Sequence, residues 1–184
     1  MRVLGISGSL RRDSHNTELL RAAATLLPPG AELEIYDGLR DIPPYAEDAP
    51  QNHPAVEDLK RRIAAADAVL FATPEYNHSI PGVLKNAIDW VSRPLAGNPL
   101  WDKPVAVIGA STGMFGAVWA QAELRKVLGA LHARVVDREL PVPTADVIVR
   151  DREKLESSGT RSQLIGLLAE LVDAAGEQRE SLAA

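Results

Sequence analysis

The residues best suited to binding chemistry lie close to the start of the chain, directly after a short apolar run at residues 3–6. Such a run is typical of a strand that is buried on both faces. Gly8 follows, and we expect it to give the backbone a conformation that other residues avoid. Five hydrogen-bond donors stand out among the side chains of the next nine residues: Ser9, Arg11, Ser14, Asn16 and Thr17. A helix is expected from about residue 15, and a helix N-terminus presents free N–H groups and about half a positive charge, so the stretch predicts an anion site.

The anion best suited to this loop is a phosphate that the protein holds but does not attack. Arg11 can bind a phosphate through two parallel hydrogen bonds. The Gly-Lys-Ser/Thr ending of a Walker loop is missing, and Gly5 and Gly8 with Asp37 match a dinucleotide fingerprint only in part. The chain has no cysteine to serve as a phosphatase nucleophile. The loop therefore favours the phosphate tail of a mononucleotide; the alternative is an ordinary turn in which Ser14 caps the helix.

Length and composition indicate one soluble domain with a substantial core. The chain has 184 residues, of which 46% are hydrophobic, and its 20 basic and 25 acidic residues give a net charge of −5. No basic stripe suggests a nucleic-acid partner, and no apolar run approaches the roughly 18 residues that a membrane span needs. The absence of cysteine excludes disulfides and thiolate metal sites. Together with the lack of a signal peptide, it fits a cytoplasmic protein.

Hydrophobic periodicity predicts five strands that alternate with five helices. Strands are expected at residues 3–6, 33–36, 68–72, 104–110 and 134–136, and helices at about 15–27, 56–66, 84–91, 120–131 and 164–175. The proline-rich residues 37–54, and residues 93–103 and 139–152, are expected to be irregular, and the residues after Gly176 to fray. A loop as long as residues 37–54 is uncommon unless it covers something or packs on a partner.

This alternation predicts a single α/β domain over residues 1–184: a doubly wound parallel sheet of five strands with helices on both faces. In such sheets ligands bind beyond the carboxyl ends of the strands, where the strand order reverses. The polar, glycine- or proline-rich loops follow the first, third and fourth strands, at residues 8–17, 73–82 and 111–116. We therefore expect these three loops to converge at one edge of the sheet.

Short motifs on two of these loops extend the argument: Gly8-Ser9-Leu10-Arg11, Ser14-x-Asn16 and Pro74-Glu75-Tyr76-Asn77. With them the chain, from residue 2 to about 175, resembles the NAD(P)H-dependent FMN reductase family, a flavodoxin-like group that includes bacterial quinone, chromate and azo-compound reductases. The resemblance implies that one set of side chains holds the FMN phosphate: Ser9, Arg11, Ser14, Asn16 and Thr17. It implies that a second set lines the isoalloxazine ring: Pro74, Glu75, Tyr76 and Asn77. A third set would close the other edge of the ring: Ser111, Thr112 and Gly113.

The resemblance further implies an enzyme in which bound FMN passes two electrons from NADH or NADPH to a quinone or another small oxidant. The two substrates would use one slot in turn, which is ping-pong behaviour. Because the cofactor carries the redox step, no side chain is required as acid or base, although Tyr76 or Glu75 could assist. The family also implies a homodimer, often paired into a tetramer, with the loop at 37–54 or the turn at 76–82 reaching the partner.

Two other functional classes stay open at this point. One is a flavodoxin-type electron carrier without a substrate site of its own, although such carriers are usually much more acidic than this chain. The other is a non-catalytic mononucleotide-binding module. Consumption of NAD(P)H by the purified protein separates the enzyme from both.

The remaining notable side chains are expected to be structural. Scattered surface positions without metal spacing are expected for the four histidines: His15, His53, His78 and His132. Core or interface positions are expected for Trp90, Trp101 and Trp119, and a solvated helix face for Glu123, Arg125 and Lys126. Apolar surface for contact between subunits is expected from Ile80, Pro81, Val83, Leu84, Met114, Phe115 and Trp119.

Overall fold

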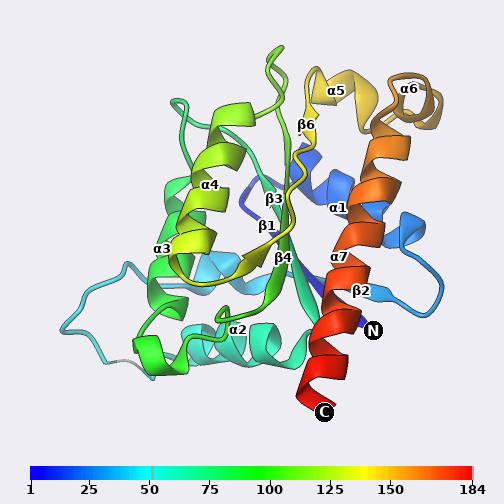
Figure 1. Cartoon of the computed structure of the whole chain (residues 1–184). Helices are drawn as coiled ribbons and strands as arrows, with labels where there is room; N and C mark the ends of the chain where they lie inside the picture. Colours follow the sequence, from blue (N-terminus) through cyan, green and yellow to red (C-terminus); the bar gives the residue numbers. More distant parts are fainter. Residues whose placement is uncertain (51, 184) are drawn as a thin grey trace.

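A parallel sheet in the strand order β2-β1-β3-β4-β5 runs through the centre of the molecule (Figure 1). The computed structural model describes residues 1–50 and 52–183. Its strands are β1 (Arg2–Ser7), β2 (Glu32–Tyr36), β3 (Ala68–Thr73), β4 (Pro104–Ala110), β5 (Arg134–Val135) and β6 (Pro141–Val142). Its α-helices are α1 (His15–Leu26), α2 (Pro54–Ala65), α3 (Gly82–Val91), α4 (Val118–Ala130), α5 (Ala145–Ile148), α6 (Arg152–Ser157) and α7 (Thr160–Ala183). Two short 3-10 helices are η1 (Gly38–Asp41) and η2 (Leu95–Gly97). The predicted doubly wound α/β fold is confirmed.

The outer strand beside β4 is divided into two short pieces, so the sheet has six strands and the predicted number of five is wrong. β5 pairs with the start of β4 at Pro104 and Val105, and β6 pairs with its end at Gly109 and Ala110. A strand of two residues carries no periodic signal, and an edge strand tolerates a proline such as Pro141. The segment 139–152, predicted to be irregular, therefore contains β6 and α5.

Helices cover both faces of the sheet. α2, α3 and α4 pack on one face, and α1 and α7 on the other (Figure 1). Successive side chains of β1 enter the two buried clusters in turn, with Leu4 and Ile6 in the first and Val3 in the second. β3 and β4 are buried along their whole length. This burial on both faces explains why the central strands are continuous apolar runs in the sequence.

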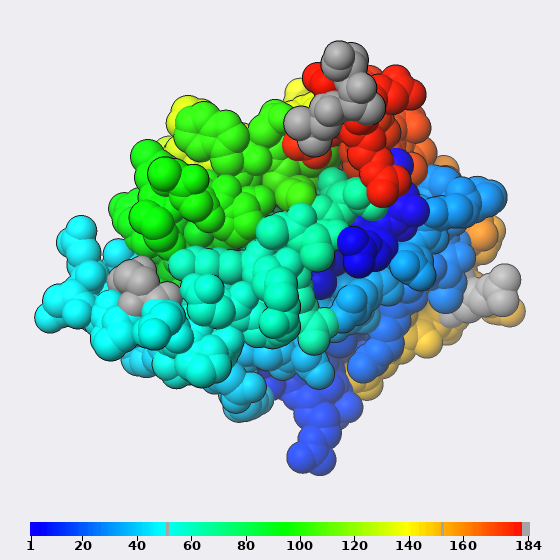
Figure 2. Space-filling view, turned by 90° about the horizontal axis from the view of Figure 1, so that it is seen from below, coloured from blue at the N-terminus to red at the C-terminus, as the bar shows by residue number. Residues whose placement is uncertain are grey.

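The chain after Gly176 does not fray, because α7 continues to Ala183. Gln178 Nε2 donates a hydrogen bond to the carbonyl of Asp102, with a donor–acceptor distance of 2.7 Å, and Arg179 Nε lies 3.1 Å from Asp67 Oδ1. Figure 2 shows this end of α7 beside the N-terminus of the chain, at the amino ends of the strands. These contacts are polar and leave no apolar stripe in the sequence. In the part of the chain that the structure describes, no helix, α7 included, is both long and apolar enough to cross a membrane.

The proline-rich loop after β2 is held against its own α3. The carbonyl of Pro43 accepts hydrogen bonds from Asn86 Nδ2 and from Trp90 Nε1, both over 2.8 Å. Asn86 Oδ1 accepts in turn from the backbone N–H of Tyr45 over 2.7 Å. The loop therefore covers part of α3 in its own chain. Its residues Gly38–Asp41 form the 3-10 helix η1, so the prediction that the whole loop is irregular is wrong.

Candidate functional site

Three loops meet at the carboxyl edge of the sheet, the upper end in Figure 1. They follow β1, β3 and β4, as the sequence predicts, and the strand order reverses between β1 and β3. We call them the first loop (residues 8–14), the second loop (residues 74–81) and the third loop (residues 111–117). Edges of this kind are the usual ligand site of doubly wound sheets.

The first loop is held by hydroxyl groups. Ser14 is the N-cap of α1, and its Oγ accepts from the backbone N–H of Thr17 over 3.3 Å. Thr17 Oγ1 donates to Ser7 Oγ over 2.9 Å, and Ser9 Oγ accepts from the N–H of Arg11 over 3.4 Å. The interpretation of Ser14 as a helix cap is thus confirmed. Ser7 was missed, although a hydroxyl on the last residue of β1, directly before Gly8, was a signal.

The N-terminal end of α1 is positively charged and carries hydrogen-bond donors that make no hydrogen bond with the described residues. The Arg11 guanidinium is exposed and makes no hydrogen bond or ion pair with the described residues. His15 is buried, so its predicted surface position is wrong, and its Nδ1 has no hydrogen-bond partner among the residues that the structure describes. Burial, together with the nearby guanidinium groups of Arg11 and Arg150, lowers the pKa of His15 below its ordinary value. Arg150, which donates to the carbonyl of Asp13 over 3.2 Å, is a second contributor that the sequence did not reveal.

A pocket of about 450 Å³ opens beside the first loop. Its polar lining consists mainly of hydroxyl and guanidinium groups: Ser7, Ser9, Arg11, Arg12, Thr17, Arg21 and Arg40. Such groups match the donors that a phosphate accepts from. The fit of this edge to a mononucleotide phosphate therefore rests on the pocket's donors and on the unpartnered Arg11.

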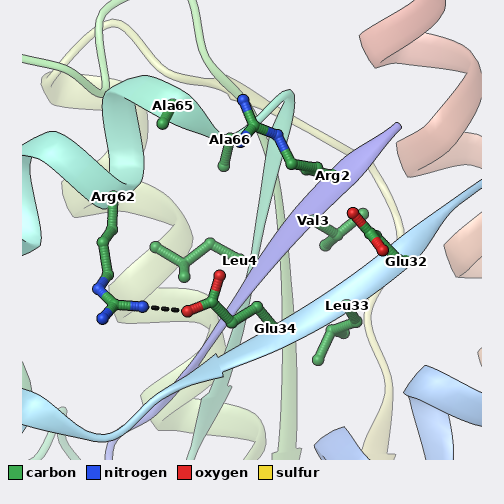
Figure 3. A pocket seen from close by; sticks show the side chains of 9 residues that line it. All are labelled: Arg2, Val3, Leu4, Glu32, Leu33, Glu34, Arg62, Ala65 and Ala66. Carbon is green, nitrogen blue, oxygen red and sulfur yellow. Dashed lines mark hydrogen bonds and ion pairs between the residues drawn. The ribbon is translucent and has the colours of Figure 1, made fainter.

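A second pocket, of about 240 Å³, lies at the opposite end of the sheet, at the amino ends of β1 and β2 (Figure 3). Its Arg62 and Glu34 side chains form an ion pair with each other, and Val3, Leu4 and Leu33 supply apolar walls. It lies away from the three loops, so we assign it no part in holding the mononucleotide.

Gly8 is required for space and not for an unusual backbone, so the expectation from the sequence is wrong here. Its φ is not among the positive values of the chain. A Cβ at this position would lie 2.9 Å from Leu84 Cδ2 and 3.3 Å from Pro74 Cδ. The Gly8 N–H also donates to the carbonyl of Ala72 over 2.8 Å. The first loop therefore packs directly against the second.

Glu75 connects the second loop to the start of α4. Its Oε2 accepts from the N–H groups of Trp119 and Ala120 over 3.0 and 3.1 Å, and its side chain is only 12% exposed. Ala117, the N-cap of α4, offers no side-chain cap, so the carboxylate of Glu75 takes that role from a distant part of the chain. Oε1 lies 3.5 Å from Nδ1 of the exposed His78. Glu75 is thus a helix cap and not a solvated charge.

A second carboxylate, that of Glu123 in α4, bonds the second loop. Glu123 Oε2 accepts from Ser79 Oγ over 2.5 Å and from the N–H of Ile80 over 3.4 Å. The turn between Tyr76 and Ser79 is tight, since Asn77 and His78 both have positive φ. Its Tyr76 ring is left 53% exposed.

The predicted solvated face of α4 is confirmed for Glu123, which is exposed, and is wrong for Arg125, whose side chain is only 16% exposed. Glu123 bonds the second loop, and Arg125 donates to the carbonyl of Val136 and pairs with Asp137. Lys126 is exposed, as predicted.

The third loop is supported by the segment that was predicted to be irregular. The Ser111 N–H donates to the carbonyl of Val142 in β6 over 3.1 Å, and the Ser111 carbonyl accepts from the N–H of Ala145 over 3.0 Å. Gly116 has a φ of +59°, and a Cβ there would lie 2.5 Å from the Val142 nitrogen. Thr112 and Gly113 are left exposed beside Ser111.

Asn16 connects the first loop to the third. Its Nδ2 donates to the carbonyl of Ala110 and its Oδ1 accepts from the N–H of the same residue, both over 2.9 Å. Together with the contacts of Gly8 and Glu75, these bonds join the start of α1 to the end of β4, the first loop to the second, and the second loop to the start of α4. The site is therefore a connected unit. Within residues 1–50 and 52–183, no cluster of three or more histidine or carboxylate side chains could hold a metal ion.

Comparisons with known proteins agree with this geometry. The family model for NADPH-dependent FMN reductase matches residues 1–146. An NAD(P)H-dependent FMN reductase of Pseudomonas aeruginosa is 54% identical over 140 residues, which make up 75% of either chain. A quinone reductase of Escherichia coli is 41% identical over 141 residues, 75% of this chain and 74% of the relative. Among solved structures, FerB, a flavoenzyme NAD(P)H:(acceptor) oxidoreductase from Paracoccus denitrificans, matches with a TM-score of 0.79 and 35% identity over 96% of this chain and 97% of FerB.

Proposed function

The chain belongs to the NADPH-dependent FMN reductase family, and from this membership we propose that FMN binds across the three loops at the carboxyl edge of the sheet. The protein is an FMN-dependent oxidoreductase that uses NADH or NADPH as reductant. One observation carries the placement of FMN: the unpartnered guanidinium of Arg11, the entrance to α1 and the exposed ring of Tyr76 lie on the same edge.

The phosphate of FMN is assigned to the first loop. Arg11 supplies a free guanidinium, Ser9 and Thr17 supply hydroxyl groups that line the pocket, and the buried Ser14 fixes the entrance to α1 as its N-cap. The partial positive charge of the helix N-terminus favours the same anion. His15 adds no net charge above its lowered pKa, so the positive charge at this point comes from Arg11 and Arg150.

The isoalloxazine ring is assigned to the second and third loops. The ring is flat, with apolar faces and a polar edge. The exposed Tyr76 ring offers a face, and Asn77 with the exposed backbone of Thr112 and Gly113 offers polar groups for the edge. Pro74 is buried behind them, against Gly8, and supports the loop from within.

The chemistry that bound FMN supplies is the acceptance of a hydride and its delivery to an oxidant. This chain's own residues bind and orient the ligand, and the Glu75 carboxylate is committed to the N–H groups of α4. We propose quinones and similar small oxidants as acceptors, in keeping with the quinone reductase among the relatives. Because reductant and oxidant must both reach one exposed face, we propose that they bind in turn.

Self-association is the further part of this proposal. An aromatic patch, formed by Tyr76, His78, Met114, Phe115 and Trp119, lies beside the proposed ring site. The Trp119 ring centroid is 4.6 Å from that of His78 and 4.9 Å from that of Phe115, and Met114 is 76% exposed. Monomeric proteins rarely expose large contiguous apolar patches. We propose that a second copy of the chain covers this patch; Leu84 and Pro81, also expected to contribute, are buried in the chain's own core.

The test begins with the flavin content of the purified protein and its affinity for added FMN. Anaerobic NADH or NADPH should bleach bound FMN directly, and oxidation of either nicotinamide should depend on an added quinone. Initial rates against NAD(P)H at several fixed quinone concentrations should give parallel double-reciprocal lines. A protein that binds no FMN would refute the proposal, and bleaching that requires an added reductase protein would identify an electron carrier.

A further inference from the structure

We propose that Asn16 is a positioning residue that holds the end of β4, and with it the ring end of the FMN site, and not a ligand of the FMN phosphate. The inference rests on the proposed function for the identity of the ligand. It replaces the role that the resemblance implied for Asn16.

The contact between Asn16 and Ala110 completes the sheet where a strand has ended. At the end of β4 the N–H groups of Gly109 and Ser111 point towards the outer segment, since they donate to the carbonyls of Leu140 and Val142. In a parallel strand, alternate residues point their backbone groups to opposite neighbours, so those of Ala110 point towards β3. β3 ends at Thr73, which pairs with Gly109. The next residue is Pro74, which has no N–H to donate.

Asn16 takes the place that β3 vacates. Its amide presents one donor and one acceptor in the arrangement of a peptide group, and it bonds both backbone groups of Ala110 at 2.9 Å. The contact is buried, and Asn16 is only 2% exposed. Buried backbone groups require such partners, because leaving them unpaired is costly. The side chain is thereby committed to the interior, and the pocket beside the first loop is lined by Ser9, Arg11 and Thr17 but not by Asn16.

The consequence for the ligand follows from where the two residues stand in the chain. Asn16 lies in the first turn of α1, two residues after Ser14, and Ala110 directly precedes Ser111. One end of the contact therefore belongs to the proposed phosphate site and the other to the proposed ring site. Without Asn16 the end of β4 and the third loop that follows it would lose their order, so a flavin ring bound there would lose affinity whether or not the ligand carries a phosphate.

Paired titrations with FMN and riboflavin test this inference, because riboflavin has the same ring system without the phosphate. Both are titrated into flavin-free protein and followed by flavin fluorescence. Asn16→Ala should weaken FMN and riboflavin by the same factor, about tenfold or more for the loss of a buried bonded pair. The matched control Arg11→Ala should weaken FMN and leave riboflavin unchanged. A loss for FMN alone in Asn16→Ala, or no loss for either flavin, would overturn the inference.

A second variant and a second measurement guard against misfolding. Asn16→Leu keeps the approximate size of the side chain, loses both hydrogen bonds to Ala110 and adds no charge beside the phosphate site, so it should again affect both flavins equally. Hydrogen exchange of flavin-free wild type needs no variant at all. The Ala110 amide should be protected like that of Val107 in the middle of β4, and rapid exchange at Ala110 would contradict the inference. A wild-type protein that binds neither flavin would refute the proposed function, while the exchange result would still decide whether Asn16 holds Ala110.

Discussion

Replacing Glu75 by alanine is expected to destabilise the start of α4 and, through it, the turn that carries Tyr76. The carboxylate accepts two backbone N–H groups at 3.0 and 3.1 Å, at a helix end with no cap of its own. A lost cap costs about 0.5–2 kcal/mol, and the favourable interaction of a negative charge with the helix dipole adds about 0.3–1 kcal/mol. We therefore expect the free energy of unfolding to fall by about 2 kcal/mol.

For a domain of this size, each kcal/mol corresponds to about 2–4 °C in melting temperature. Calorimetry of the flavin-free Glu75→Ala variant should thus show a melting temperature about 4–8 °C below that of the wild type. Glu75→Gln keeps an acceptor oxygen and loses the charge, so roughly half of that decrease is expected. Glu47→Ala, at an exposed position of the proline-rich loop, serves as the control and should leave the melting temperature unchanged.

Kinetics separate this structural role from a catalytic one. If Glu75 acts by holding the second loop, Glu75→Gln should raise the KM for the oxidant and change kcat little, because the ring site becomes less ordered. Melting temperatures of both variants equal to that of the wild type would refute the assignment of Glu75 as the cap of α4. A large loss of kcat in Glu75→Gln with an unchanged melting temperature would instead point to a direct role in the reaction.

Three further outcomes are expected. Arg11→Ala should weaken FMN binding by about one to two orders of magnitude, the value of a charge-assisted hydrogen bond, whereas Arg61→Ala on the exposed surface of α2 should not; equal flavin titrations would contradict the phosphate assignment. Because the pKa of His15 is lowered in the fold, this imidazole takes up a proton in the unfolded chain at a higher pH than in the folded one. The free energy of unfolding should therefore decrease as the pH falls from about 6.5 towards the folded pKa. Urea titrations across this range should show a weaker dependence of that free energy on pH in His15→Gln. Phe115→Asp should shift sedimentation at micromolar concentration towards the monomer, while a wild type that is itself monomeric would rule out the proposed contact through the aromatic patch.

The parts of the fold that the sequence predicts are those whose signal lies in neighbouring residues. β1, β3 and β4 are buried on both faces, so they appear as apolar runs. The first and second loops could be recognised because their donors are close together in the chain. Parallel strands then bring such loops to one edge without further assumptions.

The parts that the sequence does not predict depend on single contacts between distant residues. Asn16 and Ala110 are separated by 94 positions, and Glu75 and Trp119 by 44. Neither pair leaves a periodic pattern, so the sequence does not reveal these contacts. The same holds for Gly8, whose need for space depends on Leu84, and for α7 beyond Gly176, whose partners are Asp67 and Asp102.

The position of α7 has a consequence for how the protein is made. Leu164, Leu167 and Leu168 of this helix fill the buried cluster on one face of the sheet, which α1 covers only in part. α7 follows the other described elements in the chain, so it leaves the ribosome after them, at about 5–20 residues per second. Until it has emerged, apolar side chains of β3 and β4 face water on that side. The nascent chain therefore still exposes an apolar face, a target for aggregation or for a chaperone, after every loop of the proposed flavin site has been synthesised.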